Sequence, residues 1–128
     1  MKDLHLFLSQ YEEMFPDEVI HIEKEVSAHH QVTALAIQLE KEKRFPVLVF
    51  HNVVTEQGKS PHPLVTFVMS SRKRMASLMD TSIEQVGPAF CQRIQAGIKP
   101  VIVPRTRAPV KEVVETGDAI DLLAYPSL

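Results

Sequence analysis

A chain of 128 residues with 45% hydrophobic and 23% charged residues fits one globular domain and argues against disorder. Its net charge of −2 at pH 7 gives no electrostatic reason to expect nucleic acid or an anionic membrane surface as a partner. The single cysteine, Cys91, excludes an intrachain disulfide and is typical of a reducing compartment. The opening Met1-Lys2-Asp3-Leu4 lacks the apolar stretch of a signal peptide, and no apolar run is long enough to span a membrane, so we expect a cytoplasmic protein.

The first third of the chain predicts a helix, a strand and a second helix. Asp3 is the expected N-cap of the first helix, and Pro16 ends it. Apolar and polar residues alternate over 20–26, which predicts a strand with one solvated face. Ser27 is the expected N-cap of the second helix, which ends in the charged run 40–44. The apolar positions of the two helices are Leu4, Phe7, Leu8, Tyr11, Met14 and Phe15, and then Val32, Leu35, Ala36 and Leu39.

The middle of the chain predicts two strands and a short helix. Residues 47–50 form a continuous apolar run, which indicates a strand buried on both faces. Turn-forming residues occupy 57–61, and a second β-favouring run covers 64–69. Ser71 is the expected N-cap of a short helix whose apolar residues are Met75, Leu78 and Met79.

A further helix and a last strand are predicted before the tail. Thr81 and Glu84 have the spacing of a capping box, and Pro88 predicts a kink or a late start of this helix. Gly97 is expected to close it, and 101–103 is the last predicted strand. The residues of this helix expected to face inward are Ile83, Val86, Phe90 and Ile94.

The predicted order is α-β-α-β-β-α-α-β followed by an extended tail, so the fold class is α/β or α+β, with a mixed sheet flanked by helices. We assign residues 1–103 to the domain and 104–128 to an extended segment. Because the chain stops at Ser127-Leu128 without a terminating signal, we expect a truncated protein. The apolar residues of the tail, expected to pack on a later part of the protein, are Val113, Val114, Ile120, Leu122, Leu123 and Tyr125.

Histidine and cysteine give no clear metal or nucleophile pattern. No two histidines form an i,i+4 pair on a helix, and one cysteine cannot complete a zinc set, so surface or capping roles are favoured over a metal site. Cys91 has no base among its sequence neighbours and is interpreted as a small core residue. The six histidines are His5, His21, His29, His30, His51 and His62.

Two charged segments are candidate binding sites. The run Ser70-Ser71-Arg72-Lys73-Arg74 at a helix N-terminus suits phosphate, but a solvated first turn is favoured. Cations are unfavourable there, so an acidic group is expected to face Arg72 or Arg74. Glu23 and Glu25 share one face of a strand, where carboxylates usually maintain solubility. With four isolated glycines and no phosphate-binding loop, the pattern assigns no catalytic, cofactor-binding or metal-binding residue.

Several stretches resemble, in the same order, the N-terminal part of the UbiD family of carboxy-lyases. Residues 3–8 resemble the opening helix of the family, and His21-Ile22-Glu23-Lys24-Glu25-Val26 its first strand. Val49-Phe50-His51-Asn52-Val53 resembles a strand ending in Phe-x-Asn-Val, and Ser71-Arg72-Lys73-Arg74-Met75-Ala76 a Ser-Arg-x-Arg-x-Ala helix start. The most specific resemblance lies in 109–126, with Pro109-Val110-Lys111-Glu112-Val113-Val114, Thr116-Gly117-Asp118, Asp121-Leu122-Leu123 and Pro126.

The resemblance covers nearly the whole chain but only about the first quarter of a full-length member. The chain departs from the family pattern at 65–70, where a Gly-Asn-x-Phe-Gly segment is common, and at 78–80, where a Leu-Gly ending is usual. A third departure is Pro16-Asp17-Glu18-Val19, in place of a Gly-Glu-Leu turn. These departures leave the subfamily, and with it the substrate acid, open.

The resemblance implies the N-terminal domain of a decarboxylase of aromatic or α,β-unsaturated carboxylic acids. Members of the family use prenylated FMN with a divalent metal such as Mn²⁺ or Mg²⁺, and K⁺ is a further candidate ion. Because the family's cofactor contacts, metal ligands and Glu-Arg-Glu network lie downstream, no catalytic, cofactor-binding or metal-binding residue is carried over, and this segment alone is expected to bind no cofactor.

The partner implied by the resemblance is the rest of the enzyme or a separate catalytic subunit, in a complete protein expected to be a homo-oligomer. Arg72, Arg74 and the segment 104–128, which leads toward the catalytic domain, are the candidates for the interdomain contact. One alternative is a stand-alone, non-catalytic subunit or interaction module that completes a longer chain. Another is a small metal- or anion-binding domain built on the histidines and the Ser-Arg cluster.

Overall fold

The computed structural model describes residues 3–126. The expectations that rest on Met1-Lys2 and on the ending Ser127-Leu128 therefore lie outside the described residues. The elements in chain order are α1 (Leu4–Met14), η1 (Pro16–Glu18), β1 (Val19–Ile22), β2 (Val26–Ser27), α2 (Gln31–Lys41), β3 (Val47–Phe50), β4 (Val53–Thr55), β5 (Gly58–Lys59), β6 (Leu64–Thr66), α3 (Arg72–Leu78) and α4 (Val86–Gln95). Four 3₁₀ turns follow, η2 (Arg105–Arg107), η3 (Pro109–Lys111), η4 (Gly117–Ala119) and η5 (Leu122–Ala124).

The strands form two small mixed sheets. In the first, β3 lies between β1, to which it is parallel, and β6, to which it is antiparallel. In the second, β4 lies between the parallel β2 and the antiparallel β5. The predicted fold class, mixed β-structure flanked by helices, is confirmed, although two sheets replace the single one expected.

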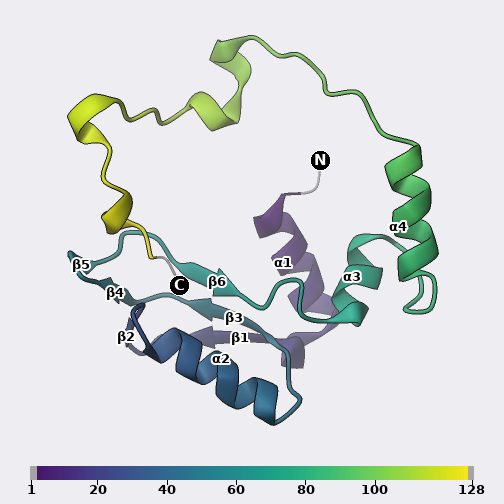
Figure 1. The fold of residues 1–128 in the computed structure, drawn as a ribbon, viewed down its shortest axis with the longest axis horizontal. Helices are drawn as coiled ribbons and strands as arrows, with labels where there is room; N and C mark the ends of the chain where they lie inside the picture. The colour runs from purple at the N-terminus through teal and green to yellow at the C-terminus, as the bar shows by residue number, and fades with distance from the viewer. Residues whose placement is uncertain (1–2, 127–128) are drawn as a thin grey trace.

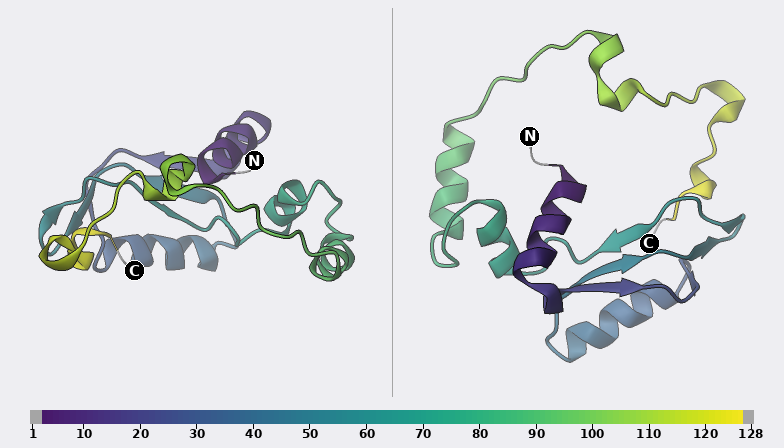
Figure 2. Two further views of the ribbon diagram at one scale, coloured as in Figure 1. Left: turned by 90° about the horizontal axis from the view of Figure 1, so that it is seen from above. Right: turned by 180° about the vertical axis from the view of Figure 1, so that it is seen from behind.

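Two helices sandwich the first sheet. α1 and α2 lie on opposite faces of it (Figure 2). On the α1 side the buried cluster is Phe7, Tyr11, Val19, Val47 and Val49, and on the α2 side it is Ala28, Val32, Leu39, Leu48, Phe50 and Val53. Every residue of β3 is buried, because its side chains alternate between these two clusters, and this confirms the prediction for 47–50.

The two N-terminal helices form largely as predicted. The Asp3 carboxylate accepts a hydrogen bond from the Leu6 N–H at 2.8 Å, and α1 ends before Pro16. Ser27, however, does not cap α2, which begins only at Gln31. Ser27 belongs to β2 instead, and its N–H donates to the side-chain oxygen of Gln31 at 2.8 Å.

Three strand predictions need correction. The strand expected over 20–26 is divided between β1 and β2, which belong to different sheets. The turn expected over 57–61 contains β5, which pairs with the unpredicted β4. The strand expected over 64–69 ends at Thr66, because Phe67 adopts a left-handed φ of 65°.

The last predicted elements differ most from the structure. α4 starts late, at Val86, so that Pro88 lies in its first turn, where proline is tolerated. Of its predicted inward residues only Val86 is buried, whereas Ile83, Phe90 and Ile94 are exposed. Residues 101–103 form no strand, and Ile102 is 96% exposed.

After α4 the chain arcs away from the body and returns beside the β4–β5 hairpin (Figure 1). The return is marked by a hydrogen bond from the Gln57 amide to the Asp121 carboxylate at 3.3 Å. The rings of His62 and Tyr125 also stack there, 5.2 Å apart. Within residues 3–126, no helix combines the length and the apolar character that crossing a lipid bilayer requires.

Candidate functional site

The most extensive buried polar arrangement surrounds Arg74 of α3, which is only 1% exposed. Its guanidinium donates to the backbone carbonyls of Val68 at 3.1 Å and Phe67 at 2.8 Å, and also to the carbonyl of Phe45. It lies 3.5 Å from the Glu18 carboxylate. Arg74 therefore ties the loops before β3 and after β6 to the end of η1.

Glu18 is the acidic centre of this arrangement. It accepts hydrogen bonds from the Tyr11 hydroxyl and from the Lys73 ammonium, and Lys73 also lies 3.8 Å above the Phe15 ring. Burial alone would raise the pKa of Glu18, but the hydrogen bonds from Lys73 and Tyr11 and the charges of Lys73 and Arg74 hold it below the ordinary 4.5. The carboxylate is thus ionised at neutral pH and faces two cations.

The pKa of Tyr11 is shifted in the opposite direction, upward. Burial, the hydrogen bond to Glu18 and the negative charge of Glu18 raise its pKa to about 12, against a smaller lowering by Arg74. The phenol is therefore held as a hydrogen-bond donor. A donor phenol, a carboxylate and two cations held in this way stabilise the contact between α1, η1 and α3.

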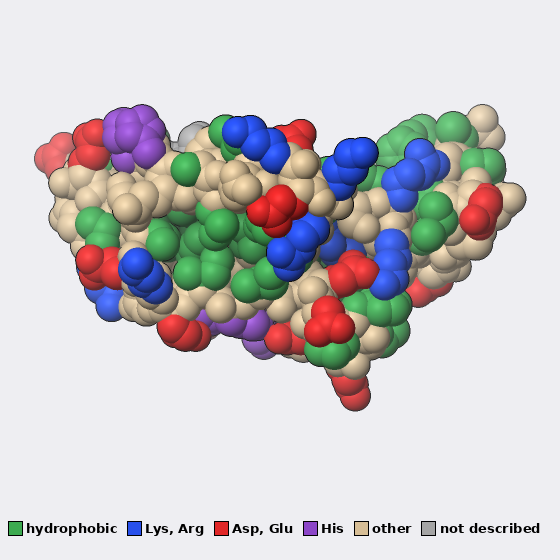
Figure 3. Space-filling model, turned by 90° about the horizontal axis from the view of Figure 1, so that it is seen from below, with side chains coloured by type: hydrophobic (Ala, Val, Ile, Leu, Met, Phe, Trp, Pro, Cys, Tyr) green, Lys and Arg blue, Asp and Glu red, His purple; other side chains and the backbone are tan. Residues whose placement is uncertain are grey.

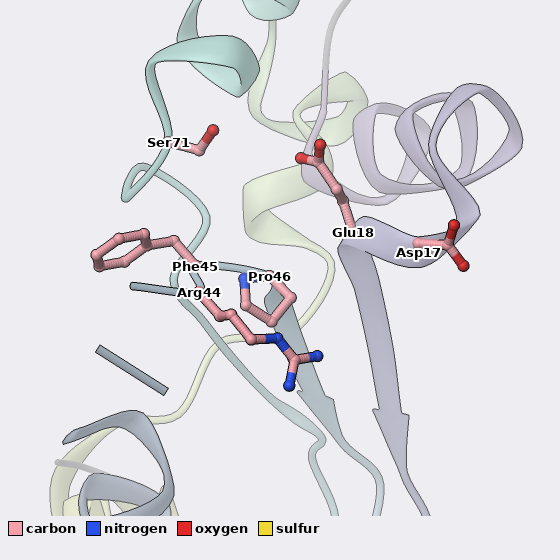
Figure 4. Close-up of a pocket in the computed structure, with 6 residues that line it drawn as sticks. All are labelled: Asp17, Glu18, Arg44, Phe45, Pro46 and Ser71. Atoms are coloured by element: carbon pink, nitrogen blue, oxygen red, sulfur yellow. The ribbon is translucent and has the colours of Figure 1, made fainter. Parts of the chain in front are cut away.

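A shallow pocket opens beside Glu18 and is shown in Figure 4. Figure 4 also shows that the Asp17 carboxylate points away from the other labelled side chains. The Arg44 guanidinium lies 3.5 Å from Glu42, so it is already paired with a carboxylate. The residues that line the pocket are Asp17, Glu18, Arg44, Phe45, Pro46 and Ser71.

The cationic run 70–74 does not converge on a common point. Arg72 is exposed, Lys73 pairs with Glu18, and Arg74 is buried. Ser71 occupies the N-cap position of α3 without a side-chain cap hydrogen bond. The expected acidic partner exists and is Glu18, but it lies within the domain. Arg74 therefore cannot reach a second domain in this structure, and its proposed interdomain role is corrected.

Sequence reasoning missed Glu18 as the partner of Arg74. The two residues are 56 positions apart, so neither local pattern nor helical spacing connects them. The one available signal was that 16–19 replaces a Gly-Glu-Leu turn in the family pattern, with its glutamate retained as Glu18. Tyr11 and Lys73 were likewise assigned only to a helix face and a cationic run.

The histidines and the cysteine lie mainly at the surface. The rings of His21 and His51 lie nearly parallel, with Nδ1 of His21 2.8 Å from Nε2 of His51, and the rings of His29 and His30 are tilted by 48°. Across residues 3–126, no three His, Cys, Asp or Glu side chains come together in a way that could hold a metal ion. Cys91 is exposed rather than buried, so its interpretation as a core residue is wrong.

A second candidate surface is apolar and covers α4 and the segment that follows it. Phe90 and Ile94 of α4 are 56% and 65% exposed. Figure 3 shows hydrophobic side chains at the surface of the right-hand lobe, where α4 lies in Figure 1. Further exposed apolar residues of the tail are Ile98, Val101, Ile102, Val110, Val113, Val114, Ile120, Leu122 and Leu123. Contiguous exposed apolar surface of this kind usually marks an interaction site.

Comparison with known proteins gives one match. Residues 14–94 match the family model described as the 3-octaprenyl-4-hydroxybenzoate carboxy-lyase N-terminal domain. Neither a curated protein nor a solved structure matches the chain. The matched range contains both sheets, α2, α3 and nearly all of α4, together with Glu18 and Arg74. The segment from 95 onward, with most of the exposed apolar residues, lies outside it.

Proposed function

The chain belongs to the UbiD family of carboxy-lyases, whose N-terminal domain it carries, and from this premise we propose that the domain is the structural, non-catalytic part of a decarboxylase. Its substrate in this proposal is an aromatic or α,β-unsaturated carboxylic acid. The proposal rests on the difference between the part of the chain up to the end of α4 and the part that follows it. The family match covers both sheets, α2, α3 and nearly all of α4, and the exposed apolar surface begins on α4 and continues beyond the match.

The packed body has the properties expected of a supporting domain. Within residues 3–126, no buried polar side-chain atom lacks a hydrogen-bond partner, so none is left directed at a ligand. The charges of Glu18 and of the buried Arg74 join α3 to η1 and to the loops before β3 and after β6. Internally satisfied networks of this kind rigidify a domain.

The pocket beside Glu18 does not fit prenylated FMN or its divalent metal. The pocket beside Glu18 presents carboxylates, which repel a phosphate, and its Arg44 is paired with Glu42. No set of metal-ligating side chains is assembled among the described residues. We therefore assign no residue of this chain to the cofactor and derive no chemical step through it.

The surface formed by α4 and residues 98–125 is our candidate for the contact with the catalytic region. Burying Phe90, Ile94 and the apolar tail residues there would remove them from water, at about 25 cal/mol per Å² of apolar surface. Arg72, which is exposed on α3, stays a candidate for the polar edge of this contact. We further propose that the complete protein is a cytoplasmic homo-oligomer without a nucleic-acid partner.

Titration of the purified chain with prenylated FMN tests the non-catalytic role. We expect no saturable change in flavin fluorescence, because the pocket beside Glu18 presents carboxylates to a phosphate and its Arg44 is paired with Glu42. An intact decarboxylase of the family serves as the positive control. Saturable binding with one flavin per chain would contradict the proposal and would place cofactor contacts within this domain.

The same apolar surface also suits a stand-alone subunit that completes a catalytic chain. The two functions differ in whether the catalytic region belongs to the same polypeptide. A reading frame that continues past Leu128 favours the domain of an enzyme, and a stop codon at that point favours the separate subunit.

A further inference from the structure

Two histidines that are 30 positions apart meet on the face of the first sheet that α1 covers. His21 lies on β1 and is in register with Val49 of β3. His51 directly follows β3, two residues after Val49. The His51 N–H donates to the Ile22 carbonyl at 3.1 Å, which fixes its backbone position. The two rings are nearly parallel, with their centroids 5.1 Å apart, and His21 Nδ1 lies 2.8 Å from His51 Nε2.

The carboxylates around this pair determine which nitrogens carry hydrogen. Glu12 of α1 lies with its Oε1 3.0 Å from His21 Nε2. An ionised carboxylate only accepts hydrogen bonds, so His21 Nε2 must donate. A neutral imidazole carries one N–H, and His21 Nδ1 is therefore an acceptor. It follows that His51 Nε2 is the donor in the bond between the two rings.

The charged groups that face the pair come from two elements. α1 contributes Glu12, and the loop after β1 contributes Glu23, whose Oε1 lies 3.6 Å from His51 Nε2. Asn52 donates to the Glu23 carbonyl at 2.7 Å and so fixes that loop. From β6, on the other side of β3, the neighbour in register is the uncharged Val65. Two carboxylates thus flank two imidazoles.

We propose that Glu12, His21, His51 and Glu23 form a protonation-sensitive clasp that holds α1 on the sheet and accepts one proton without opening. A first proton enters at His51 Nδ1 and leaves the bond between the rings in place. The shared hydrogen can then move from His51 Nε2 to His21 Nδ1, which puts the positive charge beside Glu12, the nearer of the two carboxylates. A second proton would place a hydrogen on both nitrogens of this bond, which abolishes the bond and sets two cations side by side.

Long-range ¹H–¹⁵N correlation NMR of the histidine side chains between pH 8 and pH 5 tests this arrangement. At pH 8 we expect both rings as Nε2–H tautomers. On acidification we expect the pair to take up one proton before a second, with the bond between the rings retained after the first. An Nδ1–H tautomer of His21 at pH 8, or simultaneous protonation of both rings, would overturn the proposal.

Two matched variants on the exposed face of α1 separate the clasp from a general effect of charge. Glu12→Ala removes the acceptor of His21 Nε2, so His21 should become a mixture of tautomers at pH 8. Glu13→Ala removes the neighbouring carboxylate and should leave the His21 pattern unchanged. An unchanged His21 tautomer in Glu12→Ala would show that Glu12 does not set the direction of the bond and would contradict the clasp.

Discussion

Arg74 connects segments that are distant in sequence through one guanidinium group. Its partners are three backbone carbonyls and the Glu18 carboxylate, and its side chain is almost wholly removed from water. A buried arginine is costly unless its donors are paired, and here the loops before β3 and after β6, which lie at the same end of the first sheet, supply the acceptors. The position of those loops therefore depends on this one residue.

Replacing Arg74 with alanine should lower the free energy of unfolding by about 3–5 kcal/mol, because three backbone carbonyls lose their donor and Glu18 keeps only one of its two cations. Arg74→Lys keeps the positive charge but has fewer hydrogen-bond donors, and it should lose less stability than Arg74→Ala. Arg72→Ala, two positions earlier on the same helix and exposed, should change stability by no more than about 0.5 kcal/mol. Urea unfolding of the three variants measures this order, and equal losses for Arg72→Ala and Arg74→Ala would contradict it.

The lowered pKa of Glu18 predicts a specific loss of stability in acid. A carboxyl whose folded pKa lies below its unfolded value of about 4.5 stabilises the protein above that pH, and the contribution is lost as the pH falls through the folded value. Glu18→Gln should therefore reduce the difference between the free energies of unfolding at pH 6 and at pH 3, as measured by urea unfolding. Glu13→Gln, on an exposed position of α1, is the matched control. A gap of unchanged size in Glu18→Gln would argue against an ionised Glu18 in the folded state.

At the residue scale, the sequence predicted those side-chain interactions whose partners are close along the chain. The Asp3 cap follows from a preference within one turn, and the structure contains it. The pairs Glu18–Arg74 and His21–His51 join residues 56 and 30 positions apart, so only the folded arrangement of the strands and helices brings them together.

The end of α2 has a backbone geometry that its sequence does not indicate. Lys43 has a left-handed φ of 56°; its N–H donates to Glu40 O, and the Arg44 N–H donates to Leu39 O, each at 2.9 Å. This is a Schellman motif, in which glycine usually occupies the left-handed position. The charged run 40–44 indicated where the helix ends but not how it ends.

Replacing Lys43 with glycine should raise the free energy of unfolding by about 0.5–1 kcal/mol, because glycine adopts a positive φ without the steric cost that a Cβ atom imposes. Lys43→Ala removes the same exposed side chain but keeps the Cβ atom, and it should show no gain. Thermal and urea unfolding of both variants measures the difference. Equal stability of Lys43→Gly and Lys43→Ala would contradict a left-handed helix end.

Among the elements, those with a strong apolar pattern and packed neighbours on both faces were predictable from the sequence. β3 is a continuous apolar run because both of its faces are covered, by α1 and by α2. Phe90 and Ile94 of α4 and the apolar residues 101–103 show a similar pattern, yet they are exposed in the described structure. Periodicity predicts that a face is to be buried, but it does not reveal which part of a protein buries it.

At the scale of the whole molecule, the chain consists of a packed body and an apolar arm. The body comprises the two sheets with α1, α2 and α3, and the arm runs from α4 to Tyr125, touching the body again near Gln57 and His62. Membership of the UbiD family accounts for the body. We propose that a catalytic region accounts for the exposed surface of the arm.

Hydrogen–deuterium exchange of this chain, alone and joined to or mixed with the catalytic region of a UbiD-family decarboxylase, tests that central claim most directly. Alone, amides of β1, β3 and α2 should exchange slowly, and amides of residues 98–120 should exchange fast. With the catalytic region present, α4 and residues 98–120 should gain protection while the body changes little. An arm that exchanges equally fast in both samples would contradict the account.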